Sequence, residues 1–147
     1  MNPPNRQRVL LLGATGTIGQ ATAAALLRQG HEVVCLIRPR AGANGKQQAP
    51  DGQARLQGAT WRMGDVTNPQ SLRRDGFCEE HFDAVVSCLA SRTGSPKDAW
   101  AIDYQAHVQA LQAAQEVGVK HFVLLSAICV QKPSLEFQRA KPVSYTH

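Results

Sequence analysis

The sequence predicts an α/β fold built on a doubly wound parallel sheet with helices on both faces. Short apolar runs alternate with stretches of helical periodicity, which is the pattern of βαβ units. The runs contain few polar residues, as expected for parallel strands that are buried on both faces. With 147 residues, of which 43% are apolar and 18% charged, the chain is expected to fold as one globular domain over residues 1–147.

Five strands are expected in this sheet, in the order 3-2-1-4-5. The apolar runs that predict them span residues 8–12, 32–37, 60–63, 83–88 and 120–126. In such a sheet the strand order reverses beside the first strand. Ligands bind in the crevice that forms there, at the carboxyl ends of the strands.

Three helices can be placed between these strands. The first is predicted over residues 17–29, with Gly30 as its C-terminal stop. Asn68, which is followed by a proline, predicts the start of the second, and the third is predicted over residues 100–117. Residues 40–58 are rich in glycine, glutamine and alanine and lack periodicity, so we interpret them as a mobile surface excursion.

Charge and cysteine usage exclude several classes of function. The net charge is +5, but the basic residues are scattered and no aromatic-rich RNA-binding motif accompanies them. Nucleic acid is therefore not an expected partner, and an anionic small ligand explains the sign of the charge. The four cysteines are widely spaced, which predicts neither a metal site nor a disulfide framework. No run reaches the ~18 apolar residues of a transmembrane segment, and the polar start carries neither a signal nor a transit peptide, so we expect a cytoplasmic protein.

Three glycines, spaced Gly13-x-x-Gly16-x-x-Gly19, stand where the first strand becomes the first helix. The first permits a tight turn, the second lets the backbone approach a pyrophosphate, and the third allows close packing of helix and sheet. The amides at the helix N-terminus then face the phosphates. Because the triplet follows an apolar strand and opens a helix, it predicts a Rossmann-type dinucleotide site rather than an ordinary tight turn. The cofactor-binding residues expected here are Gly13, Thr15, Gly16, Thr17, Ile18 and Gly19.

The residue at the end of the second strand distinguishes the two nicotinamide dinucleotides. An Asp or Glu at this position would hold the ribose 2′-hydroxyl of NAD, but this chain has Arg38. A guanidinium forms charge-assisted, bidentate contacts with a 2′-phosphate. NADPH is therefore the expected cofactor. The alternative is that Arg38 is only a solvated strand end.

Residues after the third and fourth strands complete the expected site. Asp65 stands where its carboxylate or amide can reach adenine, although capping of the following turn is an equal alternative, and Val66 is assigned to the same site. After the fourth strand, Cys88, Leu89 and Ala90 face the crevice. Small side chains there would let the ribose and nicotinamide pass.

Two longer runs resemble a known family. They are VVSCLASRTG at residues 85–94 and HFVLLSAICVQKP at residues 121–133, the second continued by LEFQRAK at residues 135–141. Together with the glycine spacing and Asp65-Val66, these runs resemble the divinyl chlorophyllide 8-vinyl reductases of the extended and atypical short-chain dehydrogenase/reductase superfamily. The resemblance covers residues 8–141.

The resemblance implies NADPH-dependent reduction of the 8-vinyl group of a divinyl (proto)chlorophyllide to ethyl, in chlorophyll and bacteriochlorophyll synthesis. The substrate is then a tetrapyrrole pigment, and the location is expected to be peripheral to a photosynthetic membrane. Relatives that reduce carbonyls use a Tyr-x-x-x-Lys pair, and the matching residues here are Phe137 and Lys141. The acid is missing, which counts against ketone or alcohol chemistry because an oxyanion would lack its proton donor.

Lys141 and Ser126 are the candidate catalytic residues. Lys141 is also expected to hold the nicotinamide ribose, although spacing alone is equally compatible with a surface lysine. Ser126 could orient substrate or cofactor, whereas a serine at the end of a strand often only satisfies backbone groups. Loss of the tyrosine is also expected in a non-catalytic NADP-sensing regulatory module of the same superfamily, which remains the alternative function.

Residues 142–147 depart from the family pattern. Pro142 is expected to break the helix that carries Lys141. We interpret the chain as a truncated form that lacks the C-terminal part of the fold and most of the pigment pocket, which puts catalysis by this chain alone in question. The strand at residues 120–126 would then be an uncovered apolar edge that favours self-association.

Overall fold

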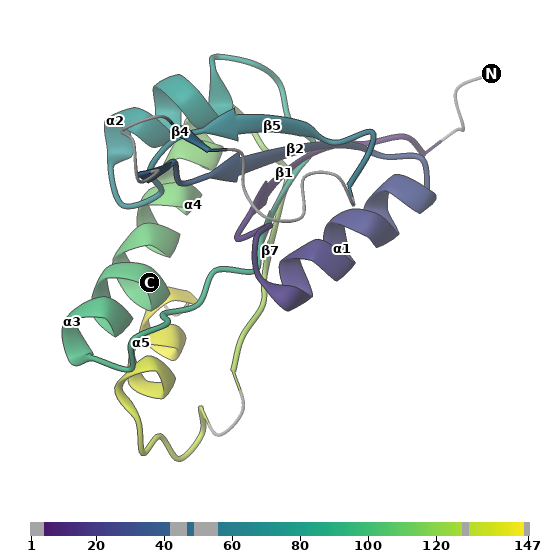
Figure 1. Ribbon diagram of the computed structural model, residues 1–147. Coiled ribbons are helices and arrows are strands. Elements are labelled where there is room, and N and C mark those ends of the chain that lie inside the picture. The colour runs from purple at the N-terminus through teal and green to yellow at the C-terminus, as the bar shows by residue number, and fades with distance from the viewer. Residues whose placement is uncertain (1–4, 42–46, 49–55, 128–129, 146–147) are drawn as a thin grey trace.

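A five-stranded parallel sheet forms the centre of the computed structural model, which describes residues 5–41, 47–48, 56–127 and 130–145. The strand order is β5-β2-β1-β6-β7 (Figure 1), which confirms the predicted order 3-2-1-4-5. The five strands are β1 (Arg8–Leu12), β2 (Glu32–Ile37), β5 (Thr60–Met63), β6 (Ala84–Ser87) and β7 (His121–Leu124). The first three have the predicted bounds.

β6 and β7 are shorter than predicted at both ends. After Ser87 the backbone leaves the sheet, and the Leu89 amide turns back to donate to the Ser87 hydroxyl (3.4 Å). On β7, the last bond to the sheet is donated by the amide of Leu125 to the carbonyl of Ser87 (2.9 Å). β7 therefore ends where β6, its neighbour among the described strands, ends.

Helices lie on both sides of the sheet, with α1 on one side and α2 and α4 on the other (Figure 1). The helical segments are α1 (Thr17–Arg28), α2 (Pro69–Ser71), the π-helical η2 (Leu72–Phe77), α3 (Pro96–Asp98), the π-helical η3 (Ala99–Ala106), α4 (His107–Glu116) and α5 (Glu136–Tyr145). Gly30 follows α1 with φ +85°, as expected of a C-terminal stop. Asn68 caps α2, because its side chain accepts hydrogen bonds from the amides of Gln70 and Ser71.

The third predicted helix is part of a longer helical run formed by α3, η3 and α4. The run begins at Pro96 rather than near residue 100, because the Ser95 hydroxyl caps it by accepting from the Asp98 amide (3.2 Å). Two turns of this run, in η3, have π-helical geometry. This widening was not predicted, because eight residues are too few to distinguish a π-helical period from that of an α-helix.

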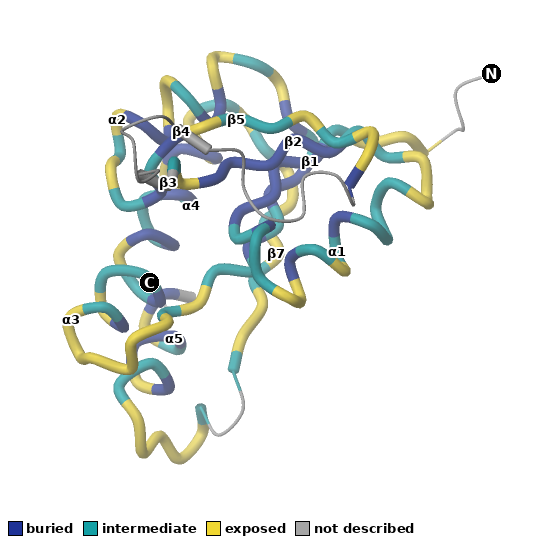
Figure 2. Tube along the Cα trace, viewed as in Figure 1, coloured by how far each residue is buried: buried dark blue, intermediate teal, exposed yellow. Residues whose placement is uncertain are grey.

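Two hydrophobic clusters cover the two faces of the sheet. Alternate residues of β1 enter opposite clusters, because successive side chains of a strand point to opposite faces. The cluster under η2 and α4 includes Leu10, Leu12, Val34, Leu36, Leu72, Phe77, Phe82, Val85, Ala110 and Ala113. The cluster under α1 includes Leu11, Ala14, Ala23, Val33, Cys35, Ile37 and Leu56. β1 and β2 are dark blue over most of their length in Figure 2, as the doubly wound arrangement requires.

Pro142 lies inside α5, so the prediction that it breaks this helix is wrong. A proline there removes the amide that would bond to the carbonyl of Gln138. The helix is held by other contacts. The Gln138 side chain accepts from the amides of Ser134 and Leu135 at the helix start (2.9 and 3.1 Å), and Lys141 is anchored in the interior.

The predicted excursion at residues 40–58 falls mostly on residues 42–46 and 49–55, outside the described part of the chain. Two short strands that we did not predict, β3 (Arg40–Ala41) and β4 (Gln47–Gln48), pair there in antiparallel fashion. Two residues are too few to show a period of two in the sequence.

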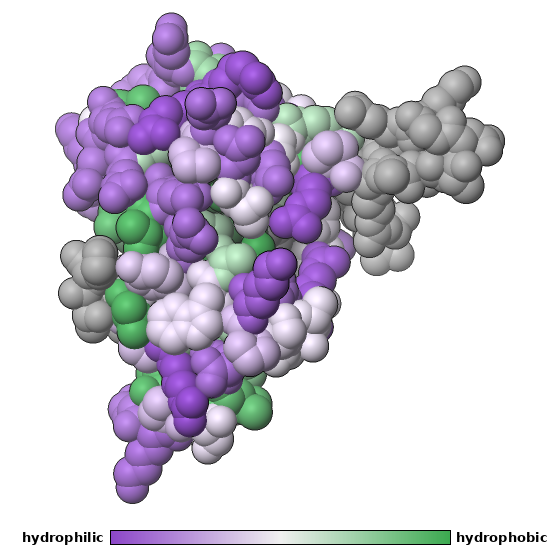
Figure 3. Space-filling model, turned by 90° about the vertical axis from the view of Figure 1, so that its left-hand side faces the viewer, coloured by the Kyte–Doolittle hydropathy of each residue, from purple (hydrophilic) through white to green (hydrophobic). Residues whose placement is uncertain are grey.

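Hydrophilic side chains cover most of the face seen in Figure 3. Among the described residues, no helix has the length and apolar character that would let it cross a membrane.

Candidate functional site

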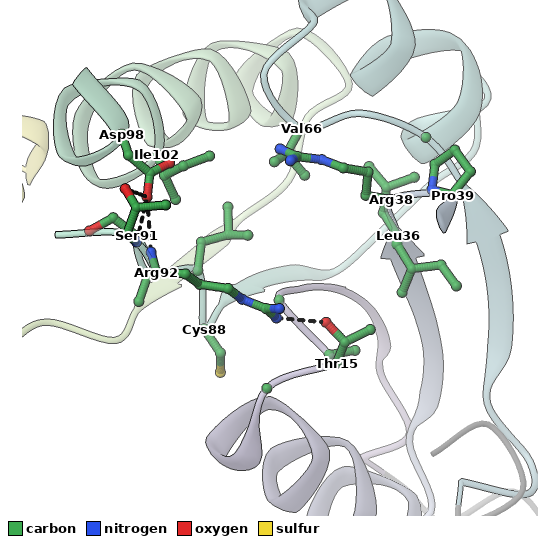
Figure 4. Close-up of a pocket in the computed structure, with 18 residues that line it drawn as sticks. Thr15, Leu36, Arg38, Pro39, Val66, Cys88, Ser91, Arg92, Asp98 and Ile102 are labelled. Atoms are coloured by element: carbon green, nitrogen blue, oxygen red, sulfur yellow. Dashed lines mark hydrogen bonds between the residues drawn. The ribbon is translucent and has the colours of Figure 1, made fainter. Parts of the chain in front are cut away.

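A cleft of about 540 Å³ lies at the carboxyl ends of β1, β2 and β6, at the point where the strand order reverses. Four segments line it (Figure 4). They are residues 13–16 after β1, residues 36–39 at the end of β2, residues 88–93 after β6, and Asp98 with Ile102 from the helical run; Gly64 and Val66 add to the wall. Its volume is in the usual range of cofactor sites.

The three glycines meet different surroundings. Gly13 has φ +79°, and a Cβ on it would stand 2.7 Å from the carbonyl carbon of Cys88. A Cβ on Gly19 would stand 1.9 Å from the carbonyl oxygen of Gly13. On Gly16 the nearest atom would be 3.7 Å away. Gly13 and Gly19 thus allow strand, turn and helix to pack together, while Gly16 leaves open space on the side of the cleft.

The N-terminus of α1 is suited to an anion. Gly16 is its N-cap residue, and neither a side-chain cap nor an acidic residue occupies the first turn. The amides of that turn therefore have no acceptor from a capping side chain, and the helix dipole favours negative charge there. Of the residues predicted to bind the cofactor here, Gly13, Thr15 and Gly16 line the cleft, whereas Thr17, Ile18 and Gly19 form the helical turn beside it.

Arg38 lies at the mouth of the cleft, after β2, and its side chain is 63% exposed. Its Nη2 atom is 3.8 Å from Oδ1 of Asp65. That carboxylate caps a turn, because the same oxygen accepts from the amide and the hydroxyl of Thr67 (2.9 and 2.7 Å). Although burial alone would raise the pKa of Asp65, these hydrogen bonds and the charge of Arg38 lower it below its ordinary value. Asp65 thus has the turn-capping role, and Val66 beside it contacts the cleft.

The segment after β6 brings residues to the cleft that we did not predict. Cys88, Leu89 and Ala90 line it as expected, and Arg92 and Asp98 join them. The Asp98 carboxylate accepts from the amides of Arg92 and Thr93, and the Thr93 bond first of all lowers the pKa of Asp98. A signal exists in the sequence, since Ser95-x-x-Asp98 before an apolar helical stretch resembles a capping box.

Lys141 does not line the cleft but lies directly behind it. It is 2% exposed, so the surface-lysine alternative is wrong. Its Nζ donates to the carbonyl oxygen of Leu89 (2.7 Å) and to Oδ1 of Asp103 (2.9 Å), which is also buried. The lysine therefore ties α5 and η3 to the segment that lines the cleft.

His107 extends this buried polar group. Its Nδ1 is 3.2 Å from the carbonyl oxygen of Asp103, and its Nε2 is 2.7 Å from Oγ of Ser87. Because a carbonyl can only accept, Nδ1 carries the proton and Nε2 accepts from the serine. Burial, followed by the charge of Lys141, lowers the pKa of His107 to about 4, so the ring is neutral at pH 7.

The remaining predicted residues lie away from the cleft. Ser126 is exposed after β7. Phe137, four residues before Lys141 on α5, is half-buried and has no proton to donate. In the described ranges, no group of three or more His, Cys, Asp or Glu side chains is placed to hold a metal ion. Burial raises the pKa of the Cys35 thiol to about 12, as expected of a core residue.

Known proteins similar to this chain include relatives by sequence and solved structures of the same fold. Divinyl chlorophyllide a 8-vinyl-reductase, chloroplastic, is 49% identical over 94% of this chain in Oryza sativa subsp. indica and 48% identical over 95% in Zea mays. The chain spans about a third of the length of these curated relatives, 34% and 35% respectively. The Bordetella bronchiseptica enzyme WbmG in complex with NAD has the same fold, with a TM-score of 0.72 at 23% identity over 97% of this chain and 49% of that one.

One family covers nearly the whole described fold. Residues 13–145, from the first glycine of the turn to the last residue of α5, match the family described as NAD(P)H-binding. The match includes every wall of the cleft and the buried group behind it. The chain therefore belongs to the NAD(P)H-binding family, and its closely similar relatives include divinyl chlorophyllide 8-vinyl reductases.

Proposed function

We propose that this chain is the NADPH-binding part of an enzyme that reduces the 8-vinyl group of divinyl (proto)chlorophyllide to ethyl, in (bacterio)chlorophyll synthesis. The observation that carries the proposal is the 49% identity to a divinyl chlorophyllide reductase over 94% of the chain, which includes all segments of the cleft. Such identity greatly exceeds the 23% shared with WbmG, a protein of the same fold.

The residues of the cleft fit NADPH. The open side of Gly16 and the uncapped first turn of α1 suit a diphosphate, and Arg38 suits a 2′-phosphate. Within the described residues, Arg38 pairs with the exposed carboxylate of Asp65 at 3.8 Å, and exposed ion pairs at such distances are weak. Its guanidinium is therefore available to a phosphate. When bound, NADPH supplies a hydride.

The two α5 positions that match the Tyr-x-x-x-Lys pair of carbonyl reductases favour a carbon–carbon double bond as the substrate group. Phe137 offers no proton, and the ammonium of Lys141 is occupied by Leu89 and Asp103. Reduction of a carbonyl requires an acid beside the developing oxyanion. A vinyl group conjugated to a macrocycle has less need of one, because the ring system spreads the negative charge.

A combined binding and turnover experiment tests this function. NADPH and NADH are titrated into the protein, divinyl protochlorophyllide is added, and absorbance is followed for loss of the vinyl-conjugated band. We expect NADPH to bind more tightly than NADH, and conversion of the divinyl pigment to the ethyl form would show that this chain also carries out the reduction. Tighter binding of NADH would contradict the role of Arg38. Binding of NADPH without conversion would contradict reduction by this chain on its own.

The proposed function also predicts where in the cell the protein is located. A tetrapyrrole pigment is largely apolar, and the proposed substrate would place the protein at the periphery of a photosynthetic membrane. Fractionation of cells that contain the protein, with and without a salt wash of the membranes, tests this. We expect the protein to be recovered in the membrane fraction and to be removed from it by the salt wash.

A further inference from the structure

Arg92 reaches across the cleft to the glycine turn. Its Nη2 donates to the hydroxyl of Thr15 (3.2 Å), a residue 77 positions earlier in the chain, and Figure 4 shows the side chain spanning the space between the two walls. Both residues line the cleft. An exposed arginine is thereby held over the turn that precedes α1.

The backbone of Arg92 is fixed independently of its guanidinium. Asp98 Oδ2 accepts from the amide of Arg92 (2.9 Å), from the amide of Thr93 (3.2 Å) and from the hydroxyl of Thr93 (3.1 Å). Asp98 itself is placed by the Ser95 cap at the start of the helical run. The arginine is therefore anchored at its base, and its charged end rests on a neutral hydroxyl.

No carboxylate neutralises Arg92 in the part of the chain that the structure describes. The ion pairs there involve other cations, and the carboxylate of Asp98 is engaged with backbone amides and Thr93. The adjacent first turn of α1 also lacks an acidic residue. Positive charge from the guanidinium and from the helix N-terminus thus adds up at one end of the cleft.

We propose that Arg92 binds the diphosphate of the dinucleotide, while Arg38 binds its 2′-phosphate. The two arginines lie on different walls of the cleft, Arg92 against the glycine turn and Arg38 at the end of β2. Each phosphate group of NADPH therefore has its own guanidinium. This assignment rests on the NADPH-binding function proposed above.

Binding measurements with fragments of the cofactor separate the two roles. ADP carries the diphosphate without a 2′-phosphate, and adenosine 2′-monophosphate carries the reverse. Kd values for both fragments, and for NADPH and NADH, are measured by competition or calorimetry for the wild type, Arg92→Gln and Arg38→Gln. Arg28→Gln is the matched control, because it removes the same charge at the exposed far end of α1, roughly 17 Å along the helix.

Arg92→Gln is expected to weaken the binding of ADP, NADPH and NADH by about the same factor, roughly tenfold. Its affinity for adenosine 2′-monophosphate should be unchanged. Arg38→Gln is expected to weaken the binding of NADPH and adenosine 2′-monophosphate and to leave the binding of ADP and NADH unchanged. Arg28→Gln should change none of them. Since a lysine keeps the charge but not the planar fork, Arg92→Lys should lie between Arg92→Gln and the wild type.

Two results would overturn the assignment: an unchanged affinity of Arg92→Gln for ADP, or an equal loss for ADP and adenosine 2′-monophosphate. Thermal unfolding shows whether each variant is folded, and Arg92→Lys serves as the test if Arg92→Gln is not. A wild-type chain that binds neither NADPH nor NADH would instead contradict the proposed function. The two failures are therefore distinguishable.

Discussion

Gly16 and Gly19 differ in what a methyl group would meet, although they are part of one turn. A Cβ would stand 1.9 Å from a backbone oxygen at Gly19 but 3.7 Å from the nearest atom at Gly16. Gly19→Ala is expected to lower the free energy of unfolding by roughly 3 kcal/mol or more, because the backbone must shift. Gly16→Ala should cost at most about 1 kcal/mol and weaken NADPH binding several-fold, because its methyl group enters the cleft.

Urea unfolding of both glycine variants and NADPH titration of Gly16→Ala check this pair. A Gly16→Ala protein that is folded and binds NADPH as tightly as the wild type would refute the role given to the turn. A Gly19→Ala protein with unchanged stability would refute the close packing of turn and helix.

Lys141 is expected to be among the costliest residues to replace. Lys141→Met leaves the carboxylate of Asp103, 1% exposed, without its cation, and such a loss is worth about 3–5 kcal/mol. Replacing both partners, as in Lys141→Met with Asp103→Leu, should restore much of the stability because no buried charge remains. Chemical denaturation of the single and double variants measures this.

Arg139→Met, on the same helix but with a side chain 54% exposed, is the control for Lys141. It should change the free energy of unfolding by less than about 1 kcal/mol. If Arg139→Met were as destabilising as Lys141→Met, the effect would come from α5 as a helix and not from the buried ion pair.

At the scale of elements, His107 joins β6 to the η3–α4 run and makes their packing sensitive to pH. The groups that face its ring are Ser87, Asp103 and Lys141. Its pKa is about 4 in the folded protein against an ordinary 6.5, so the unfolded chain binds more protons between these values. Stability is therefore complete above pH 6.5 and falls by roughly 3 kcal/mol as the pH drops to 4.

Thermal unfolding between pH 4 and 7 measures this dependence on pH. His107→Gln should flatten the curve in that window, whereas His81→Gln, which removes a histidine with a 66% exposed side chain, should leave it unchanged. An equally steep curve for His107→Gln would show that other groups cause the loss of stability.

The elements that the sequence predicts best are those set by local pattern. β1, β2 and β5 have their predicted bounds because each coincides with a short run bounded by polar or turn residues. The helix through Pro142 was not predictable in this way. The proline opposes a helix, and the long-range contacts of Lys141 with Leu89 and Asp103 override that tendency.

At the scale of the whole molecule, the candidate site shows the same difference between local pattern and contacts that are distant in the sequence. The glycine turn and Arg38 could be assigned because their meaning depends on position relative to a neighbouring strand. Arg92 could not be assigned in this way, because its contact with Thr15 joins residues that are 77 positions apart. The contact of Lys141 with Asp103 likewise joins residues that are 38 positions apart. Only the folded chain brings these pairs together.

The exposed edge of the sheet predicts self-association of the whole molecule. Among the described strands, β7 pairs with β6 alone, and Val123 and Leu125 at this edge are 53% and 36% exposed. An apolar strand edge of this kind favours pairing with a second copy. Size-exclusion chromatography over a range of concentrations should show dimers or larger species for the wild type and more monomer for Val123→Lys.

Leu135→Lys is the control for the edge, because Leu135 is similarly exposed, at 55%, but lies outside the sheet. It should leave the elution profile unchanged. A wild-type protein that elutes as a stable monomer at every concentration would contradict association through β7.

The placement of β1 has a mechanical consequence for the cleft. β1 is hydrogen-bonded to β2 on one side and to β6 on the other, and its last four residues are buried. The glycine turn continues directly from this strand, so the wall that we propose to bind the phosphates is supported by the most firmly held part of the sheet. The arginines are carried by segments beyond the ends of their strands. A ligand that enters the cleft therefore meets a rigid wall of backbone amides. Any movement that fits the cleft to the ligand must come from the opposing walls.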